Sequence, residues 1–378
     1  MDMKQAWAEY KEKALKVPLL TAAGLAKASL KKMGASHVGP CPSCGGKDCF
    51  SVNHRSDGGW YWNCRREGTG GETSIGLICH AMGVDSDTAK EILTGDPLPT
   101  GKTTWSESER RAFDERRETA QRETENEEGD RSQSEDRALL KAQRIWDASD
   151  TMKGTPAELY LLNRGHPLRE WPDCFRFHPA VEYEHLAKFE EYERDGRTYH
   201  RKVKAGPKLP CFVCRVDDVL GDLTGIWRIY ITEDGQKARV PDQPGCKIGL
   251  GPVRGGAVRL SEAHSGEVTL VEGVETGNRL FSFSGVPTWA TLSTSGLRSF
   301  QVPAQIELVR LYGDGDHLKW NTVKQCWMPP PGESAMLAAK ENIMAQGVPV
   351  VEMRAPRPGR RGRDWENVAN AVDGTRYR

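Results

Sequence analysis

The stretch EVTLVEGVETG at residues 267–277 is followed by a second stretch of the same kind, IELVRLYGDGD at residues 306–316. Each is an apolar run that stops abruptly at acidic residues and glycine, as a buried parallel strand does where its carboxyl end reaches a site. Glu272 stands at the end of the first run, and Asp314 and Asp316 stand at the end of the second. Alternate residues of an extended chain point to the same side, so Asp314 and Asp316 face together. The pattern predicts an α/β fold with a mostly parallel sheet and a site at its carboxyl edge.

Three carboxylates at neighbouring strand ends predict an oxygen-rich cage for a divalent cation. Mg²⁺ or Mn²⁺ binds carboxylates together with water and phosphate oxygens, which is the chemistry of phosphoryl transfer. An isolated Asp-Gly-Asp is more often a turn than a metal site. Two strand-end acidic motifs in order, with a helix-like segment between them, favour the metal site. We therefore expect Glu272, Asp314 and Asp316 to be the catalytic ligands.

The same residues carry a resemblance to a known family. VEGVETG, LYGDGD and the later RDWENVANA resemble the Toprim domain of phage and plasmid DNA primases. The resemblance implies a magnesium-dependent site in which Asp364 reaches a second metal ion. Where the family usually ends the last motif with Asp, this chain has Asn367. The resemblance also implies a protein encoded by a phage or mobile element in a bacterial cell.

The composition fits a chain of several domains. Its 378 residues are enough for two or three of them. The 53 basic and 53 acidic residues balance, so local basic patches rather than bulk charge would have to hold nucleic acid. No apolar run approaches a membrane span, and we expect a cytoplasmic protein with no membrane partner. In a reducing compartment, the ten cysteines are expected to be metal ligands or buried thiols rather than disulfides.

Residues 37–64 have the pattern of a zinc ribbon. Cys41 and Cys44 form a Cys-x-x-Cys followed by glycines, a turn that brings two thiolates to one ion. Residues 50–52 and 60–62 are predicted to form a hairpin that returns Cys64 to the metal. We expect His37 to be the fourth ligand, because it lies just before the turn and Cys3His is a common structural set. The sequence leaves four alternatives open: Cys49, Glu67, Cys79 and His80.

This zinc motif and its surroundings predict the domain order. GPCPSCGGKDCF and WNCRREGTGGETSIGLI are similar to the N-terminal zinc domain of phage-type primases, which usually has Asp-Arg-Phe at the place of Asp48, Cys49 and Phe50. Residues 106–136 are almost wholly charged and polar, so they are not expected to bury enough apolar surface to offset their conformational entropy. We predict four segments: a zinc-ribbon DNA-binding module with flanking helices at 1–97, a flexible charged linker at 98–136, the basic N-terminal part of a primase core at 137–262, and a Toprim catalytic domain at 263–378.

A basic region precedes the first acidic strand. Residues 197–208, RTYHRKVKAGPK, suit a single-stranded template or a solvated hairpin equally well. Arg228, Lys237 and Lys247 are the candidates for binding nucleotide and template. By resemblance, Arg228 and Lys247 correspond to basic residues that hold nucleotide phosphates and the primer-template backbone. Further along, residues 317–333 form a Trp-containing insertion that fits a hairpin but reveals no function.

These observations favour a DNA primase that makes short RNA primers on single-stranded DNA. Structural Zn²⁺ and catalytic Mg²⁺ or Mn²⁺ are the expected cofactors, and a DNA template and ribonucleoside triphosphates are the expected partners. A separate replicative helicase is a further expected partner. The alternatives are a Toprim nuclease or topoisomerase-like enzyme, and a non-catalytic zinc-containing protein that binds single-stranded DNA.

Overall fold

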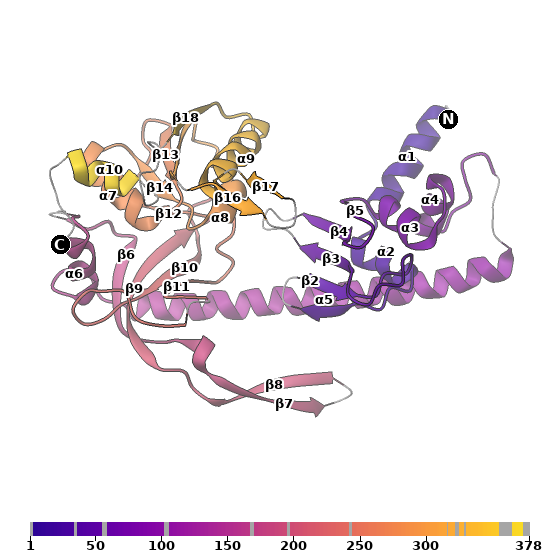
Figure 1. Ribbon diagram of the computed structural model, residues 1–378, viewed down its shortest axis with the longest axis horizontal. Helices are drawn as coiled ribbons and strands as arrows, with labels where there is room; N and C mark the ends of the chain where they lie inside the picture. The colour runs from indigo at the N-terminus through magenta and orange to yellow at the C-terminus, as the bar shows by residue number, and fades with distance from the viewer. Residues whose placement is uncertain are drawn as a thin grey trace. The chain divides into compact units, whose positions relative to one another are not determined.

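The computed structural model divides into two compact units, residues 1–134 and 135–378 (Figure 1). It describes residues 3–33, 36–54, 59–101, 106–166, 170–194, 197–241, 244–315, 317–321, 325–328, 330–354 and 365–372. Of the predicted site residues, Asp316 and Asp364 lie outside these ranges. Among the residues described, no helix combines the length and the apolar character that crossing a membrane requires.

The first unit is built around an antiparallel sheet in sequential order. Its strands are β1 (Lys31–Met33), β2 (Ser36–Gly39), β3 (Phe50–His54), β4 (Trp60–Cys64) and β5 (Thr69–Gly71). Four short helices accompany the sheet: α1 (Met3–Leu15), α2 (Leu19–Leu25), α3 (Ser74–Met82) and α4 (Ser86–Thr94). Their apolar faces share one core with Phe50, Val52 and Trp62 of the sheet. The predicted hairpin of the zinc ribbon is confirmed as β3 and β4.

Helix α5 (Glu107–Asp147) occupies most of the segment that was expected to be a flexible linker. The sequence was expected to form a flexible or transiently helical tether here, and residues 107–136 are helical. Within the first unit, a narrow stripe of this helix packs on α2: Ala120 and Thr124 are buried, and Thr124 Oγ1 lies 3.0 Å from Thr21 Oγ1. The stripe continues to Glu127, which faces His37. Glu, Arg, Gln and Ala are good helix formers, so a few packed side chains suffice to order a segment with little apolar content.

The second unit contains the end of α5 and then helix α6 (Pro156–Asn163), whose N-cap Thr155 accepts a hydrogen bond from the Glu158 backbone N–H. An antiparallel sheet follows, in the order β11-β10-β9-β6. Its strands are β6 (Phe175–Glu182), β9 (Lys208–Asp217), β10 (Leu223–Tyr230) and β11 (Lys247–Leu250). After the short 3-10 helix η1 (Glu184–Leu186), strands β7 (Lys188–Arg194) and β8 (Arg197–Lys204) form a separate hairpin. Figure 1 shows this hairpin extending away from the sheet.

The remainder of the unit is a five-stranded sheet in the order β12-β14-β13-β15-β18. Strands β14 (Thr288–Ala290), β13 (Glu267–Val271), β15 (Leu308–Gly313) and β18 (Val350–Arg354) are parallel, and only β12 (Val258–Arg259) runs against them. Helices α7 (Val274–Ser284) and α10 (Trp365–Val372) lie on one face, and α8 (Thr294–Arg298) and α9 (Pro331–Ala345) lie on the other (Figure 1). The small hairpin of β16 (Lys319–Asn321) and β17 (Cys326–Met328) follows β15. The predicted mostly parallel α/β sheet is confirmed.

Alternating side chains of β13 and β15 divide this sheet into two packed faces. Val268, Leu270, Val309 and Leu311 pack with apolar residues of α9 in one core. Val271 and Tyr312 belong to a second core, together with Val274 and Leu280 of α7 and Trp365 of α10. A parallel sheet covered on both faces leaves only its strand ends open to ligands.

Candidate metal centres and catalytic edge

Four cysteine side chains of the first unit converge on one point. The Sγ atoms of Cys41, Cys44, Cys49 and Cys64 all lie within 4.8 Å of one another. Cys44 Sγ is 3.3 Å from Cys49 Sγ and 3.7 Å from Cys64 Sγ. Zn–S bonds of about 2.3 Å in a tetrahedron put neighbouring sulfurs about 3.8 Å apart, so these four thiols fit Zn²⁺. A hydrogen bond from the Gly46 backbone N–H is the main reason that the pKa of Cys44 is lowered to about 7.

The fourth member of this cluster is Cys49, and the expectation of His37 is wrong. The buried imidazole of His37 has its Nε2 3.0 Å from Glu127 Oε1 on α5. Cys49 was one of the alternatives, and the register of the β3–β4 hairpin explains its position. Phe50 pairs with Cys64, so the residue just before β3 lies beside the last residue of β4. That register is readable from the sequence once the two strands are aligned.

His80 lies close to the four-cysteine cluster. Its Nε2 is 3.3 Å from Cys41 Sγ, and its ring stacks on Trp62 with 5.0 Å between centroids. His80 also belongs to a smaller group of possible ligands with Cys64 and Glu67. Because Cys64 is shared between the two groups, one ion occupying the four sulfurs leaves His80 as a neighbour that orients a ligand.

Glu272 and Asp314 each follow the last residue of a parallel strand, at the same edge of the sheet. Strands β13 and β15 are direct neighbours in a register that runs from Glu267 opposite Leu308 to Leu270 opposite Leu311. Continuing that register by two residues brings Glu272 level with Gly313, one residue before Asp314. Both carboxylates are half-buried. Two hard oxygen ligands at one strand-end edge would suit Mg²⁺ or Mn²⁺.

Helix α10 is held at that edge by an aromatic residue. The Trp365 indole Nε1 donates to the carbonyl oxygen of Gly313 at 3.0 Å, and its ring packs edge-to-face on Tyr312 with 4.9 Å between centroids. Gly313 is the last residue of β15 and immediately precedes Asp314. The start of α10 and the end of β15 are therefore fixed to each other.

A buried carboxylate one turn beyond Glu272 was not predicted as functional. Glu275, in the first turn of α7, is only 3% exposed. Its Oε1 is 2.6 Å from Lys247 Nζ and accepts a hydrogen bond from the Tyr160 hydroxyl at 2.7 Å. Burial alone would raise the pKa of Glu275, but Lys247 and then Arg164 outweigh it and hold this pKa well below its usual range. This network ties α6 and β11 to the helix that follows the first acidic strand.

A second buried carboxylate repeats the arrangement on α10. Glu366 binds the Arg164 guanidinium through both oxygens, at 3.0 Å from Nε and 2.5 Å from Nη2. Its Oε1 also lies 2.9 Å from His166 Nε2. Burial favours a raised pKa for Glu366, yet the hydrogen bond with His166 and the charge of Arg164 lower it. Arg164 thus contributes to both networks, which neither spacing nor motif indicated in the sequence.

The three predicted basic residues have different environments. Arg228 is 4% exposed, and its guanidinium donates to the Tyr230 hydroxyl and the Gly249 carbonyl oxygen. A phosphate contact by Arg228 is therefore not consistent with the structure, because a strand position that looks basic in sequence faces the core. Lys247 is paired with Glu275 as described. Lys237 is exposed, although partial burial of its ammonium group and then the charge of Lys247 lower its pKa.

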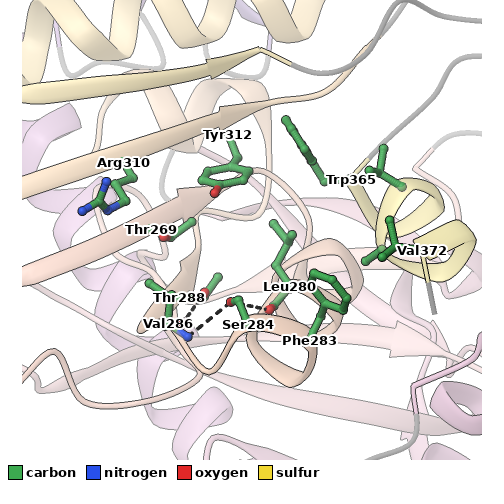
Figure 2. Close-up of a pocket in the computed structure, with 12 residues that line it drawn as sticks. Thr269, Leu280, Phe283, Ser284, Val286, Thr288, Arg310, Tyr312, Trp365 and Val372 are labelled. Carbon is green, nitrogen blue, oxygen red and sulfur yellow. Dashed lines mark hydrogen bonds between the residues drawn. The ribbon is translucent and has the colours of Figure 1, made fainter.

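A separate pocket of about 330 Å³ lies on the α7 and α10 face of the sheet (Figure 2). Figure 2 shows its floor, where the Ser284 hydroxyl donates to the Leu280 carbonyl and accepts from the Val286 N–H. Its walls are mainly apolar. Arg310 is the one charged side chain among the described residues that line it, and Glu267 pairs with Arg310 at 2.6 Å. Such a lining does not suit a triphosphate, so this pocket is distinct from the carboxylate edge.

Comparisons with known proteins match two consecutive segments of the second unit. Residues 136–260 match a domain of unknown function (DUF7146), and residues 267–373 match the Toprim domain. No curated protein matches the sequence. Among solved structures, the zinc-binding and RNA polymerase domains of the Aquifex aeolicus primase are similar with 17% identity and a TM-score of 0.38, covering 97% of this chain and 83% of that chain.

Two further solved structures are similar at the same distant level. A DNA primase domain from Pseudomonas aeruginosa has 16% identity and a TM-score of 0.36, covering 62% of this chain and 74% of that chain. The primase fragment of the bacteriophage T7 primase-helicase protein has 12% identity and a TM-score of 0.31, covering 89% of this chain and 95% of that chain. The chain thus carries a Toprim domain at residues 267–373, preceded near its N-terminus by a four-cysteine site that suits zinc.

Proposed function

We propose that this chain is a DNA primase, which joins ribonucleotides into short primers on single-stranded DNA. The observation that carries the proposal is the pair Glu272 and Asp314 at the carboxyl ends of adjacent parallel strands of a Toprim domain. With Asp316, these residues would hold Mg²⁺ or Mn²⁺, and Asp364 would serve a second ion. When bound, such ions neutralise the charge of a triphosphate and favour ionisation of the attacking hydroxyl.

The chain's own residues supply position and charge. We assign Lys237 to the phosphates of the incoming nucleotide, because it is a solvent-exposed cation beside Lys247 and Arg164. Lys247 has a positioning role, since its ammonium group holds Glu275 and thereby the first turn of α7. The first unit, which carries the four-cysteine site, would contact the DNA template.

The test is primer synthesis on single-stranded DNA with labelled ribonucleotides and Mg²⁺. The native chain is expected to make short RNA products, and Asp314→Asn to lose at least about a hundred-fold in rate, because a metal ligand becomes a neutral amide. Glu307→Gln is the matched control: this exposed carboxylate immediately precedes β15, at the opposite end of the strand from Asp314, and its loss should leave the rate unchanged.

Two outcomes would refute the proposal. Cutting of the DNA without RNA synthesis would indicate a Toprim nuclease or topoisomerase-like enzyme. Binding of the DNA with neither reaction, equally in the native chain and in Asp314→Asn, would indicate a non-catalytic single-stranded DNA binding protein.

A further inference from the structure

The hairpin that follows the second acidic strand exposes two tryptophans side by side. Trp320 on β16 and Trp327 on β17 are cross-strand partners, with ring centroids 5.4 Å apart and ring planes at 70°. They are 45% and 63% exposed, and Leu318 beside them is 56% exposed. Tryptophan is the side chain most enriched in binding hot spots, so a pair of them left in solvent marks a contact surface.

The chain connection keeps this pair near the catalytic edge. Trp320 follows Asp314 by six residues, so their Cα atoms can be at most about 22 Å apart even if the chain between them is fully extended. A strand of nucleic acid that reaches the carboxylates can therefore reach the hairpin within a few nucleotides.

The local charge suits a polyanion. Residues 317–332 contain two lysines and a histidine but no aspartate or glutamate. The preceding strand end, by contrast, is acidic. A phosphate backbone would be attracted to the hairpin, while the metal ions would receive the phosphates at the carboxylate edge.

The ring geometry leaves a face available for stacking. In an edge-to-face pair, only one of the two rings has a face covered by its neighbour. A second exposed aromatic pair among the described residues of this unit is different: the rings of Tyr192 and Tyr199 on the β7–β8 hairpin are stacked, with 5.6 Å between centroids and 24° between planes. Those two rings cover each other's inner faces.

We propose that Trp320 and Trp327 form a stacking platform for an unpaired base of the single strand that enters the catalytic edge. The inference rests on the proposed function in that it names the contact between this site and its template. Stacking of a base on an aromatic side chain is independent of the base sequence and contributes about 1–3 kcal/mol. The platform would hold the template without choosing its sequence.

The experiment measures binding of a fluorescein-labelled oligothymidylate to the zinc-loaded full-length chain by anisotropy, without nucleoside triphosphates so that catalysis does not contribute. Trp320→Ala with Trp327→Ala is expected to weaken binding about 10-fold to 100-fold. The double Phe variant, which keeps two stacking rings, should bind within a few-fold of the native chain. The matched control is Phe283→Ala on α7, which removes an aromatic ring that is 45% exposed, as Trp320 is, and this variant should bind like the native chain.

A second probe separates stacking from charge. An oligonucleotide of the same length made of abasic sites has phosphates but no bases, so the native chain and the double Ala variant should bind it equally. The inference is overturned if the double Ala variant binds oligothymidylate like the native chain. It is also overturned if this variant loses the same factor with the abasic strand, or if its thermal unfolding differs from that of the double Phe variant. Failure of primer synthesis in the native chain, with these binding results intact, would refute the proposed function and leave the platform in place.

Discussion

Replacing Glu275 by Gln tests whether the buried network stabilises the second unit. The substitution preserves shape and removes one charge, so Lys247 loses its counter-ion while Arg164 keeps its pair with Glu366. Breaking a fully buried ion pair costs about 3–5 kcal/mol. Lys247 is 34% exposed, so solvent screens part of the loss, and Gln still accepts a hydrogen bond from Tyr160. We therefore expect a loss of about 2–3 kcal/mol in the free energy of unfolding.

The measurement is differential scanning calorimetry of the full-length chain. Zinc chelation should shift the thermal unfolding transition of the first unit and leave the transition of residues 135–378 unchanged. The unchanged transition is the one to compare between variants. For a unit of this size, a loss of about 2–3 kcal/mol lowers Tm by roughly 5–10 °C. Glu267→Gln is the matched control, because Glu267 and Arg310 form an ion pair of the same length, 2.6 Å, with both side chains more than a third exposed. That change should lower Tm by less than about 2 °C.

The pH dependence of the Tm difference provides a second test of the same reasoning. Because the native pKa of Glu275 is lowered, its stabilising effect is fully present above the ordinary glutamate pKa of about 4.3 and is lost as the pH falls toward the native value. The Tm difference between the native chain and Glu275→Gln should be constant from pH 8 to about pH 5 and should narrow below about pH 4. Equal small shifts for Glu275→Gln and Glu267→Gln, or a difference that grows on acidification, would refute the reasoning.

Two further predictions concern the first unit. Cys49→Ser should lower the zinc content measured by mass spectrometry and destabilise residues 1–134, whereas His37→Ala should retain one zinc per chain; the reverse pattern would restore His37 as the ligand. Gly24→Ala places a Cβ 2.7 Å from the Ala120 Cβ. Although alanine by itself favours a helix, this clash should loosen α5 from α2 and speed proteolysis within residues 107–134. Unchanged cleavage would mean that this half of α5 is not held by α2.

The sequence predicted the two adjacent parallel strands whose ends carry Glu272 and Asp314, because local patterns determine such strands. A buried parallel strand needs a continuous apolar run, and its end needs residues that tolerate solvent, so Glu272 and Asp314 were visible without any tertiary information. Three of the four cysteines in the cluster, Cys41, Cys44 and Cys64, were predicted from local spacing for the same reason. Its fourth member depended on the register between two strands, which a spacing rule for cysteines does not contain.

The long helix and the buried networks were missed because both depend on distant partners. Residues 107–136 have too few apolar side chains to predict a packed helix, yet Phe113, Ala120 and Thr124 recur at intervals of seven and four. That spacing was the sequence signal from which a packed helix could have been predicted. Arg164 and Glu366 are 202 residues apart, and an acid early in a helix ordinarily suggests only a favourable interaction with the helix dipole.

The Glu275 network bears on the proposed metal site as well as on stability. Glu275 lies in the first turn of α7, and the turn that leads into this helix contains Glu272. A helix whose first turn is held by Lys247 and Tyr160 fixes the backbone from which the Glu272 carboxylate projects. Metal sites lose affinity when the groups that position their ligands are removed. Glu275→Gln should therefore raise the Mg²⁺ concentration needed for half-maximal primer synthesis even at temperatures where the chain is fully folded, while Glu267→Gln should not. A loss of stability without any change in Mg²⁺ requirement would show that the network holds the two sheets of the unit together but does not position the catalytic edge.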